Sequence, residues 1–360
     1  MIALSTDRQR ELIRNIAGAS DTRDLACIRD EAEQSVDIAL EQDDPLTPVG
    51  KMVAGLNDAL VARLIVLTER RLQTKGEILP PVRFCWLSFG SDGRQEQCIR
   101  TDQDTAIVYE DPPAGLQAAA AHYFTSLGMA VTDGLAACGF SRCPGNNMAS
   151  NPEWCQPFSV WRSYVHRWLR IPEPLALLHA STIFDFRPAY GDATLAQALR
   201  RAITDELAID RTSLLLMARD ALHHPPPTTF FGRLVCEPRG PQAGHFDIKL
   251  RAIKPTTEAV RLLALDAGIH EHTGTVERLG LLSETDQSIR EIGAGVASAY
   301  TLFLRYRSTH GKRSVDGGRY LDVSHMDAHS TTCLRDAIER TEALLTLIRV
   351  RYQLDVLGLR

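Results

Sequence analysis

Residues 82–110 read VRFCWLSFGSDGRQEQCIRTDQDTAIVYE, and the predicted fold is arranged around this stretch. Its first part, residues 82–89, is an apolar run with the length and residue types of a buried strand. A Gly-Ser-Asp-Gly turn follows at residues 90–93, and a second apolar run covers residues 106–109. This order predicts two strands that are joined by a polar connection.

The second apolar run is entered through Asp102-Gln103-Asp104. Because side chains alternate between the two faces of a strand, we expect Asp102 and Asp104 on one side and Gln103 on the other. Two neighbouring carboxylates repel each other, and a divalent cation removes that repulsion. Mg²⁺ is often held by one or two carboxylates together with substrate phosphates. The pair therefore predicts a site for one or two Mg²⁺ ions.

Gly90 and Ser91 lie just upstream of the two aspartates. Bare backbone N–H groups and one hydroxyl at such a turn can hold phosphate oxygens. Arg94 follows, and its guanidinium can reach a triphosphate as a charged fork, with an ion pair to Glu96 as the alternative. Together these residues predict metal-assisted transfer on a nucleoside triphosphate.

The same residues carry a resemblance to a known family. Gly90-Ser91, ten intervening residues and then Asp102-x-Asp104 resemble the signature of the DNA polymerase β-like nucleotidyltransferase superfamily. The motif GSDGRQEQ…TDQD is similar to that of the PII-uridylyltransferase-like branch of this superfamily, whose members are often attached to CBS domains. Four later stretches resemble the substrate-binding domain of that branch: CPGNNMASNPEW, IFDFRPAYGD, PPPTTFFGRLV and FDIKLRAIKP. The resemblance runs from about Asp24 to the C-terminus and implies that the aspartates share the metal.

Most members of that superfamily carry a third carboxylate on a neighbouring strand, where it completes the metal site and can take a proton from the attacking hydroxyl. The sequence has no carboxylate between Phe140 and Met148. Asp185 and Asp247 are candidates for the missing base. The other interpretations are a nucleophile that needs little activation, or a protein that binds nucleotide without transferring it.

The predicted fold class is α+β in three parts. A helical lead-in covers residues 1–75, a small mixed-sheet nucleotidyltransferase domain covers residues 76–150, and a helical substrate-binding domain covers residues 151–360 and is expected to cover the active-site cleft. Apolar residues at helical spacing, such as Leu56, Leu60 and Leu64, support the lead-in. Amphipathic helices of this kind leave a homodimer surface as an alternative use.

Downstream of the aspartates, the pattern predicts a long helix at residues 116–138 and a third strand at residues 139–143. A short hairpin between residues 230–235 and 245–250 is also predicted. Further helices are expected at residues 192–207, 212–223, 256–267, 284–308 and 331–354. Three tryptophans spaced by seven favour core packing over ligand stacking: Trp154, Trp161 and Trp168.

Composition sets limits on the partners. A net charge of −5 and a pI of about 6.1 give no general attraction to nucleic acid, so no nucleic-acid partner is expected. No apolar run approaches the roughly 18 residues that a membrane span needs, so no membrane partner is expected. The charged N-terminus lacks a signal-peptide core, and eight scattered cysteines favour reduced thiols in the cytoplasm.

The sequence as a whole predicts an enzyme that moves a nucleoside monophosphate from an NTP to a hydroxyl of a protein or small-molecule acceptor. The resemblance implies a [protein-PII] uridylyltransferase-like activity, while the identity of the NTP stays open. Lys249 is expected to contact phosphate as a point charge, with an ion pair as the alternative. The rival hypothesis is a catalytically weak or inactive nucleotide-binding module in signalling.

Overall fold

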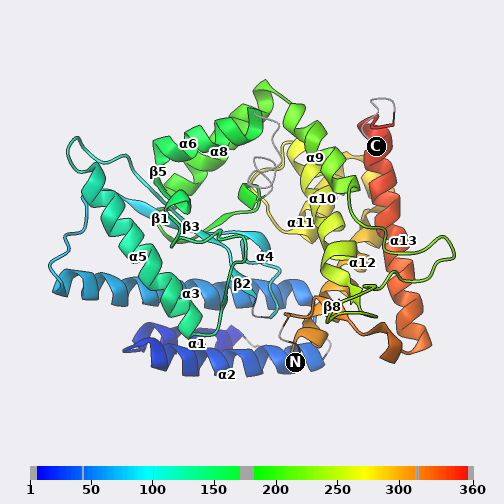
Figure 1. Ribbon diagram of the computed structural model, residues 1–360, viewed down its shortest axis with the longest axis horizontal. Coiled ribbons are helices and arrows are strands. Elements are labelled where there is room, and N and C mark those ends of the chain that lie inside the picture. Colours follow the sequence, from blue (N-terminus) through cyan, green and yellow to red (C-terminus); the bar gives the residue numbers. More distant parts are fainter. Residues whose placement is uncertain are drawn as a thin grey trace. The chain divides into compact units, whose positions relative to one another are not determined.

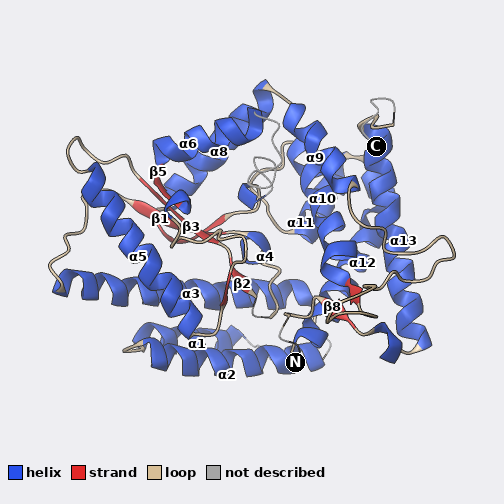
Figure 2. Ribbon diagram, in the orientation of Figure 1, coloured by secondary structure: helices blue, strands red, loops and turns tan. Residues whose placement is uncertain are grey.

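The computed structural model describes residues 6–42, 44–99, 101–170, 182–312, 314 and 316–355. These residues form two compact units. The first unit extends to Trp168 and takes in Thr182–Glu206, and the second contains the residues from Leu207 onward. The first unit is therefore discontinuous in sequence. Figure 2 shows short strands set among helices, as the predicted α+β class requires.

Three helices precede the sheet of the first unit: α1 (Thr6–Gly18), α2 (Thr22–Glu41) and α3 (Leu46–Thr74). Helix α2 is capped by Asp21, whose side chain accepts hydrogen bonds from the first backbone N–H groups. Helices α1 and α2 both pack against α3, which buries the apolar stripe that the sequence shows. The predicted helical lead-in is confirmed over the described residues.

The main sheet has four strands in the order β5-β3-β1-β6. The strands are β1 (Phe84–Ser88), β3 (Thr105–Tyr109), β5 (Cys155–Pro157) and β6 (Arg187–Gly191). Strand β1 runs antiparallel to both β3 and β6, whereas β3 and β5 are parallel. The predicted mixed sheet is confirmed, and two of its strands lie beyond residue 150.

The sheet is covered on one side by the helices that precede β1 and follow β3 in the sequence. Figure 1 shows α3 and α5 (Gln117–Ala137) on one side of the strands, and both helices contact the sheet. A Cβ on Gly128 of α5 would lie 2.1 Å from the carbonyl oxygen of Ala149, so only glycine permits this approach. All five residues of β3 are buried, which explains its unbroken apolar run.

The three tryptophans form one aromatic cluster in the first unit. Helix α6 (Phe158–Arg170) begins directly after Pro157 and carries Trp161 and Trp168, while Trp154 lies in the preceding 3₁₀ turn. The ring of Trp154 lies 5.8 Å from that of Trp161 and 5.9 Å from that of Trp168. All three side chains are buried, which confirms the prediction of core packing.

Helices dominate the second unit. They are α9 (Thr212–Leu222), α10 (Lys254–Asp266), α11 (Thr275–Thr285), α12 (Gln287–Gly311) and α13 (Ala328–Arg351). Helix α12 packs against both α11 and α13. Side chains of Asp286 and Asp327 cap α12 and α13. The predicted helices are confirmed apart from their ends, and α11 was not predicted. Helix α8 (Ala193–Ile209) precedes them.

The predicted hairpin is wrong. Strand β7 (Phe246–Asp247) pairs in antiparallel fashion with β8 (Tyr320–Leu321) and not with residues 230–235. The side chains of Phe230 and Phe231 are 98% and 86% exposed, so this apolar pair adds nothing to a core. Asp247 is instead buried beside β8, where it binds Arg319. The ion pair between Asp247 and Arg319, which are far apart in the sequence, stabilises the pairing of β7 with β8.

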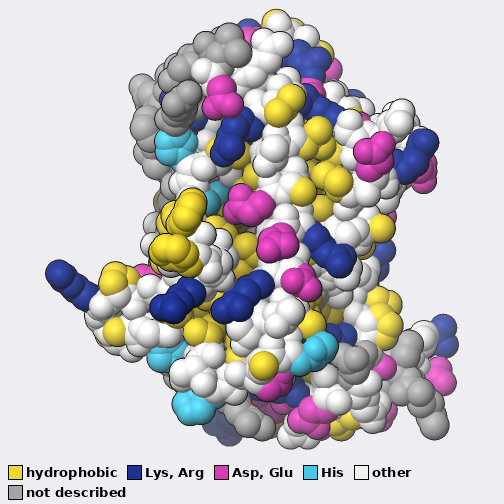
Figure 3. All heavy atoms as spheres, turned by 90° about the vertical axis from the view of Figure 1, so that its right-hand side faces the viewer, with side chains coloured by type: hydrophobic (Ala, Val, Ile, Leu, Met, Phe, Trp, Pro, Cys, Tyr) yellow, Lys and Arg dark blue, Asp and Glu magenta, His cyan; other side chains and the backbone are white. Residues whose placement is uncertain are grey.

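One face of the molecule is mixed in charge. Figure 3 shows acidic and basic side chains interspersed with apolar ones on one face. This mixture agrees with the modest net charge of −5. Among the described residues, the helices all fall short of the combined length and hydropathy that crossing a membrane would require.

Candidate active site

The side chains of the two aspartates and of the glutamine between them lie on different sides of the strand. Asp102 and Gln103 form the short strand β2, and Asp104 leads directly into β3. The buried Gln103 side chain donates hydrogen bonds to the carbonyl oxygens of Thr132 (3.2 Å) and Phe140 (3.4 Å). Asp102 and Asp104 are only partly buried. The predicted alternation is therefore confirmed, and Gln103 anchors the strand from its inner side.

The Gly90 turn lies directly against Asp104. Gly90 has a φ of +59°, and a Cβ added there would lie 2.7 Å from Oδ2 of Asp104. The backbone N–H of Phe89 donates to the carbonyl oxygen of Asp104 at 2.9 Å. The positive φ favours glycine, and a Cβ there would displace the Asp104 carboxylate. The structure thus brings the predicted phosphate-binding turn, with the half-buried Ser91, to the predicted metal ligands.

A cysteine completes this cluster. Strand β4 (Ser141–Arg142) runs parallel to β2 and is followed at once by Cys143. One carboxylate oxygen of Asp102, one of Asp104 and the sulfur of Cys143 all lie within 4.8 Å of one another. The third strand was predicted, but Cys143 was missed because only a carboxylate was sought there. Its position just after that strand was the available signal.

The electrostatic surroundings keep Cys143 protonated. Burial raises the pKa of its thiol to about 12, with further contributions from the charge of Asp104 and a hydrogen bond to that carboxylate. The cluster therefore combines two carboxyl groups with a neutral thiol. This cluster offers two oxygen ligands and one sulfur ligand, and the adjoining Gly90 leaves the backbone accessible. Such an arrangement fits a divalent cation that also contacts phosphate.

Arg94 takes part in a buried ion-pair network. Its Nε lies 2.7 Å from a carboxylate oxygen of Glu96, and its Nη1 lies 3.1 Å from Oδ2 of Asp185. The side chain of Asp185 is 1% exposed. The ion pair with Glu96 was the predicted alternative to phosphate binding, and Asp185, a candidate base, is held in the same network. Contact between Arg94 and phosphate stays a prediction.

A second arginine fixes the turn to its surroundings. Arg187 on β6 places Nη1 2.7 Å and 2.6 Å from the two carboxylate oxygens of Asp58 on α3. Its Nε and Nη2 each lie 3.0 Å from Asp92, at the carbonyl oxygen and at Oδ2 respectively. Asn57 donates to the other carboxylate oxygen of Asp92 at 2.9 Å. The turn that contains Gly90 is thereby tied to both α3 and β6.

Two predicted residues belong to the second unit. Asp247 is 1% exposed and accepts hydrogen bonds from Arg319 (Nε, 2.9 Å) and from the backbone N–H of Leu250 (2.9 Å). This candidate base is thus held in an ion pair. Lys249 is exposed and begins a π-helical turn rather than lying on a strand. Its contact with phosphate stays a prediction.

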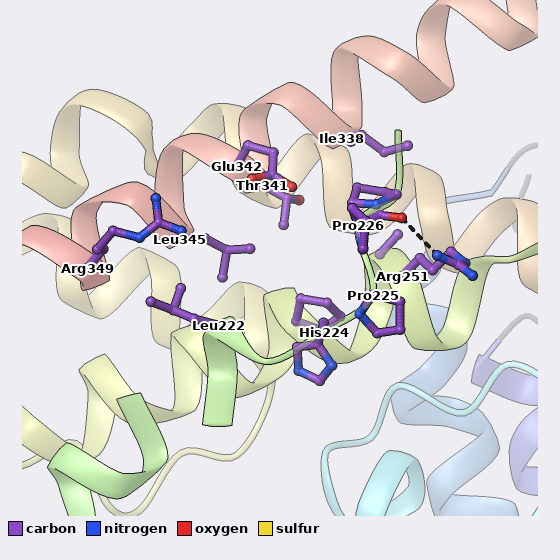
Figure 4. Close-up of a pocket in the computed structure, with 13 residues that line it drawn as sticks. Leu222, His224, Pro225, Pro226, Arg251, Ile338, Thr341, Glu342, Leu345 and Arg349 are labelled. Carbon is purple, nitrogen blue, oxygen red and sulfur yellow. Dashed lines mark hydrogen bonds between the residues drawn. The ribbon is translucent and has the colours of Figure 1, made fainter. Parts of the chain in front are cut away.

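The second unit also contains a cavity of about 180 Å³ (Figure 4). Apolar side chains such as Leu222, Pro225 and Leu345 line part of its wall. Arg251 and, from α13, Glu342 and Arg349 add charged groups, and burial raises the pKa of Glu342. A wall that combines apolar side chains with a few charged groups suits a small-molecule ligand.

A mixed sheet that presents two aspartates beside a glycine turn places the chain among nucleotidyltransferases as a class. Family comparison makes the assignment narrower. Residues 30–175 match the family described as "Putative nucleotidyltransferase DUF294". Residues 211–352 match its companion, "Putative nucleotidyltransferase substrate binding domain". The two matches together span most of the chain, which belongs to this family. No curated protein matches it.

Proposed function

We propose that the protein transfers a nucleoside monophosphate group from an NTP to a hydroxyl, in a reaction that requires a divalent cation and releases pyrophosphate. The observation that carries this proposal is the position of Asp102 and Asp104 against the Gly90 turn. Membership of a nucleotidyltransferase family supports it. Mg²⁺ is the ion that the carboxylate pair predicts. We also propose that the protein acts in the cytoplasm and forms a homodimer.

Each residue of the site has a specific task in this reaction. Asp102 and Asp104 hold the ion, which when bound neutralises charge on the triphosphate and the attacking oxygen. Gly90 allows phosphate oxygens to approach the backbone, and the Ser91 hydroxyl donates a hydrogen bond to them. Gln103 and Arg187 maintain the positions of these groups through the hydrogen bonds described above. Catalysis then depends mainly on positioning and charge neutralisation.

The acceptor proton requires a destination. The candidates Asp185 and Asp247 both carry ion pairs with arginines, and Cys143 is a neutral thiol. These contacts favour an acceptor hydroxyl that needs little activation and loses its proton to solvent. They also favour, as a second candidate function, a module that binds NTP without turnover.

The acceptor is a small molecule or a protein. The cavity of the second unit supports a small-molecule substrate, because it lies within the segment that matches a substrate-binding domain. Its apolar side chains and its three charged residues, Arg251, Glu342 and Arg349, favour a ligand with an apolar body and at least one charged group.

The test is incubation of the protein with each α-³²P-labelled NTP, a divalent cation and lysate of the source organism. A folded double variant, Asp102→Asn with Asp104→Asn, serves as the control. Label on an acceptor that requires both aspartates supports transfer, and the labelled species identifies the acceptor class. Cation-dependent NTP binding without any labelled acceptor supports the binding module. Equal labelling by the double variant contradicts the assignment of this site.

A further inference from the structure

We propose that Cys143 is a ligand of the metal centre, so that the centre binds one thiophilic divalent cation such as Zn²⁺ through two carboxylate oxygens and one sulfur. This inference rests on the proposed function only in placing the cation at the site of nucleotide transfer. It differs from the sequence-based expectation of an all-oxygen Mg²⁺ site. The carboxylate that the wider superfamily places on the neighbouring strand is replaced here by a thiol.

The geometry suits a single cation. Bonds from Zn²⁺ to oxygen are about 2.1 Å and to sulfur about 2.3 Å, so the donors of a tetrahedral site lie about 3.5 Å apart. The three donor atoms lie within 4.8 Å of one another. Rotations of the Asp102 and Asp104 side chains, which are only partly buried, bring the donors to that separation. Three protein ligands also leave one position open for substrate, which is the usual arrangement of catalytic zinc sites.

The backbone holds Cys143 at this place. Asp102 pairs with Ser141 and Gln103 with Arg142 in the parallel β2–β4 pair, so Cys143 continues β4 alongside Asp104. The segment after Cys143 returns to β3, where the backbone N–H of Thr105 donates to the carbonyl oxygen of Asn147 at 3.0 Å. The backbone N–H of Cys143 itself lies 3.4 Å from the sulfur of Met148. The sulfur is therefore positioned before any ion arrives.

The ligand chemistry sets the preference for the ion. Mg²⁺ takes oxygen ligands and tolerates little departure from octahedral geometry, whereas sulfur ligands select Zn²⁺ and similar ions. When the ion binds, the thiol releases its proton to solvent and the sulfur becomes an anionic ligand. The cation supplies the charge that makes this favourable. Zn²⁺ and Co²⁺ should therefore bind more tightly than Mg²⁺, by a margin that depends on Cys143.

The experiment uses Co²⁺ as a spectroscopic probe that requires no nucleotide. The full-length protein is titrated with Co²⁺, and absorbance is followed in the near-ultraviolet band that arises from a sulfur–cobalt bond. The wild-type protein should show the band. Cys143→Ser should lose it and weaken Co²⁺ binding by at least the roughly 10- to 100-fold that loss of an outer-shell partner costs. The exposed Cys27 provides the matched control, because Cys27→Ser should leave the band unchanged.

A second variant tests the preference directly. Cys143→Asp restores a third carboxylate, so it should lose the sulfur band and gain in affinity for Mg²⁺ relative to Co²⁺. Circular dichroism checks that each variant is folded. Absence of the band from the wild-type protein, or its persistence in folded Cys143→Ser, overturns the inference. Loss of NTP transfer with the band intact would instead count against the proposed function alone.

Discussion

Replacement of Arg187 by methionine is expected to destabilise the first unit strongly. Methionine keeps much of the aliphatic length but removes the guanidinium that binds Asp58 and Asp92. The change leaves two carboxylates without their common cation. They then repel each other on either side of an apolar side chain, at the turn that carries Gly90.

The magnitude follows from burial. Arg187 is 11% exposed, Asp92 is 18% exposed and Asp58 is 31% exposed. Breaking a buried ion pair by removing one partner costs about 3–5 kcal/mol. Because Asp58 is partly hydrated, we expect the lower end, about 3 kcal/mol, for Arg187→Met. The stability of Arg187→Lys should lie between those of the wild type and Arg187→Met, because an ammonium group cannot contact both carboxylates as a planar guanidinium does.

The tryptophans provide a selective assay. All four tryptophans of the chain lie in the first unit: Trp86, Trp154, Trp161 and Trp168. Their fluorescence during urea unfolding therefore reports on this unit and not on the second. The midpoint for Arg187→Met should fall with an unchanged slope, which is the signature of lower stability.

A matched control distinguishes this network from ordinary surface pairs. Arg142 and Asp133 form an ion pair in which both side chains are more than half exposed. Arg142→Met should change the free energy of unfolding by only about 0–1 kcal/mol. If Arg187→Met causes a loss no larger than that of Arg142→Met, the reasoning from burial is refuted.

Three further predictions concern the glycine turn, a buried carboxylate and the cavity. Gly90→Ala should weaken Co²⁺ binding because its Cβ displaces the Asp104 carboxylate; Gly76→Ala, which also has a positive φ but open space around it, should not. Burial alone would raise the pKa of Glu258, but a hydrogen bond from a neighbouring histidine and nearby cations hold it below its ordinary value. Its stabilising contribution is therefore present at neutral pH and is lost as the pH falls through that lowered pKa. Glu258→Gln should destabilise the second unit at pH 7. The difference in free energy of unfolding between this variant and the wild type, measured by circular dichroism, should become smaller when the pH is well below about 4.3. Leu345→Trp should fill part of the cavity and reduce acceptor labelling, while NTP binding measured by calorimetry stays unchanged.

Local patterns were sufficient to predict the centre of the site. The alternation of Asp102, Gln103 and Asp104 follows from strand geometry, and the apolar residues of β1 and β3 mark buried strands without reference to anything distant. Helix ends and amphipathic stripes likewise depend on neighbours within a few residues. The paired aspartates beside the Gly90 turn could therefore be expected from residues 82–110 alone.

Contacts between distant segments could not be predicted in the same way. Strand β6 reads Arg-Pro-Ala-Tyr-Gly, which lacks a strand pattern. It is tolerated because β6 is an edge strand, where Pro188 removes no bond that a further strand would need. The proximity of Cys143 to the aspartates depends on the parallel β2–β4 pairing, which the local pattern around the cysteine does not specify.

The discontinuity of the first unit has a consequence during synthesis on the ribosome. Cys85 of β1 pairs with Gly191 of β6, so one edge of β1 stays open until a long further segment has been translated. Closing so long a loop is slow, and an apolar strand with an open edge can pair with other nascent chains. A fragment ending at residue 175, where the first family match stops, would keep that edge open permanently. Such a fragment should aggregate, whereas one extended through Glu206 should be able to complete its sheet.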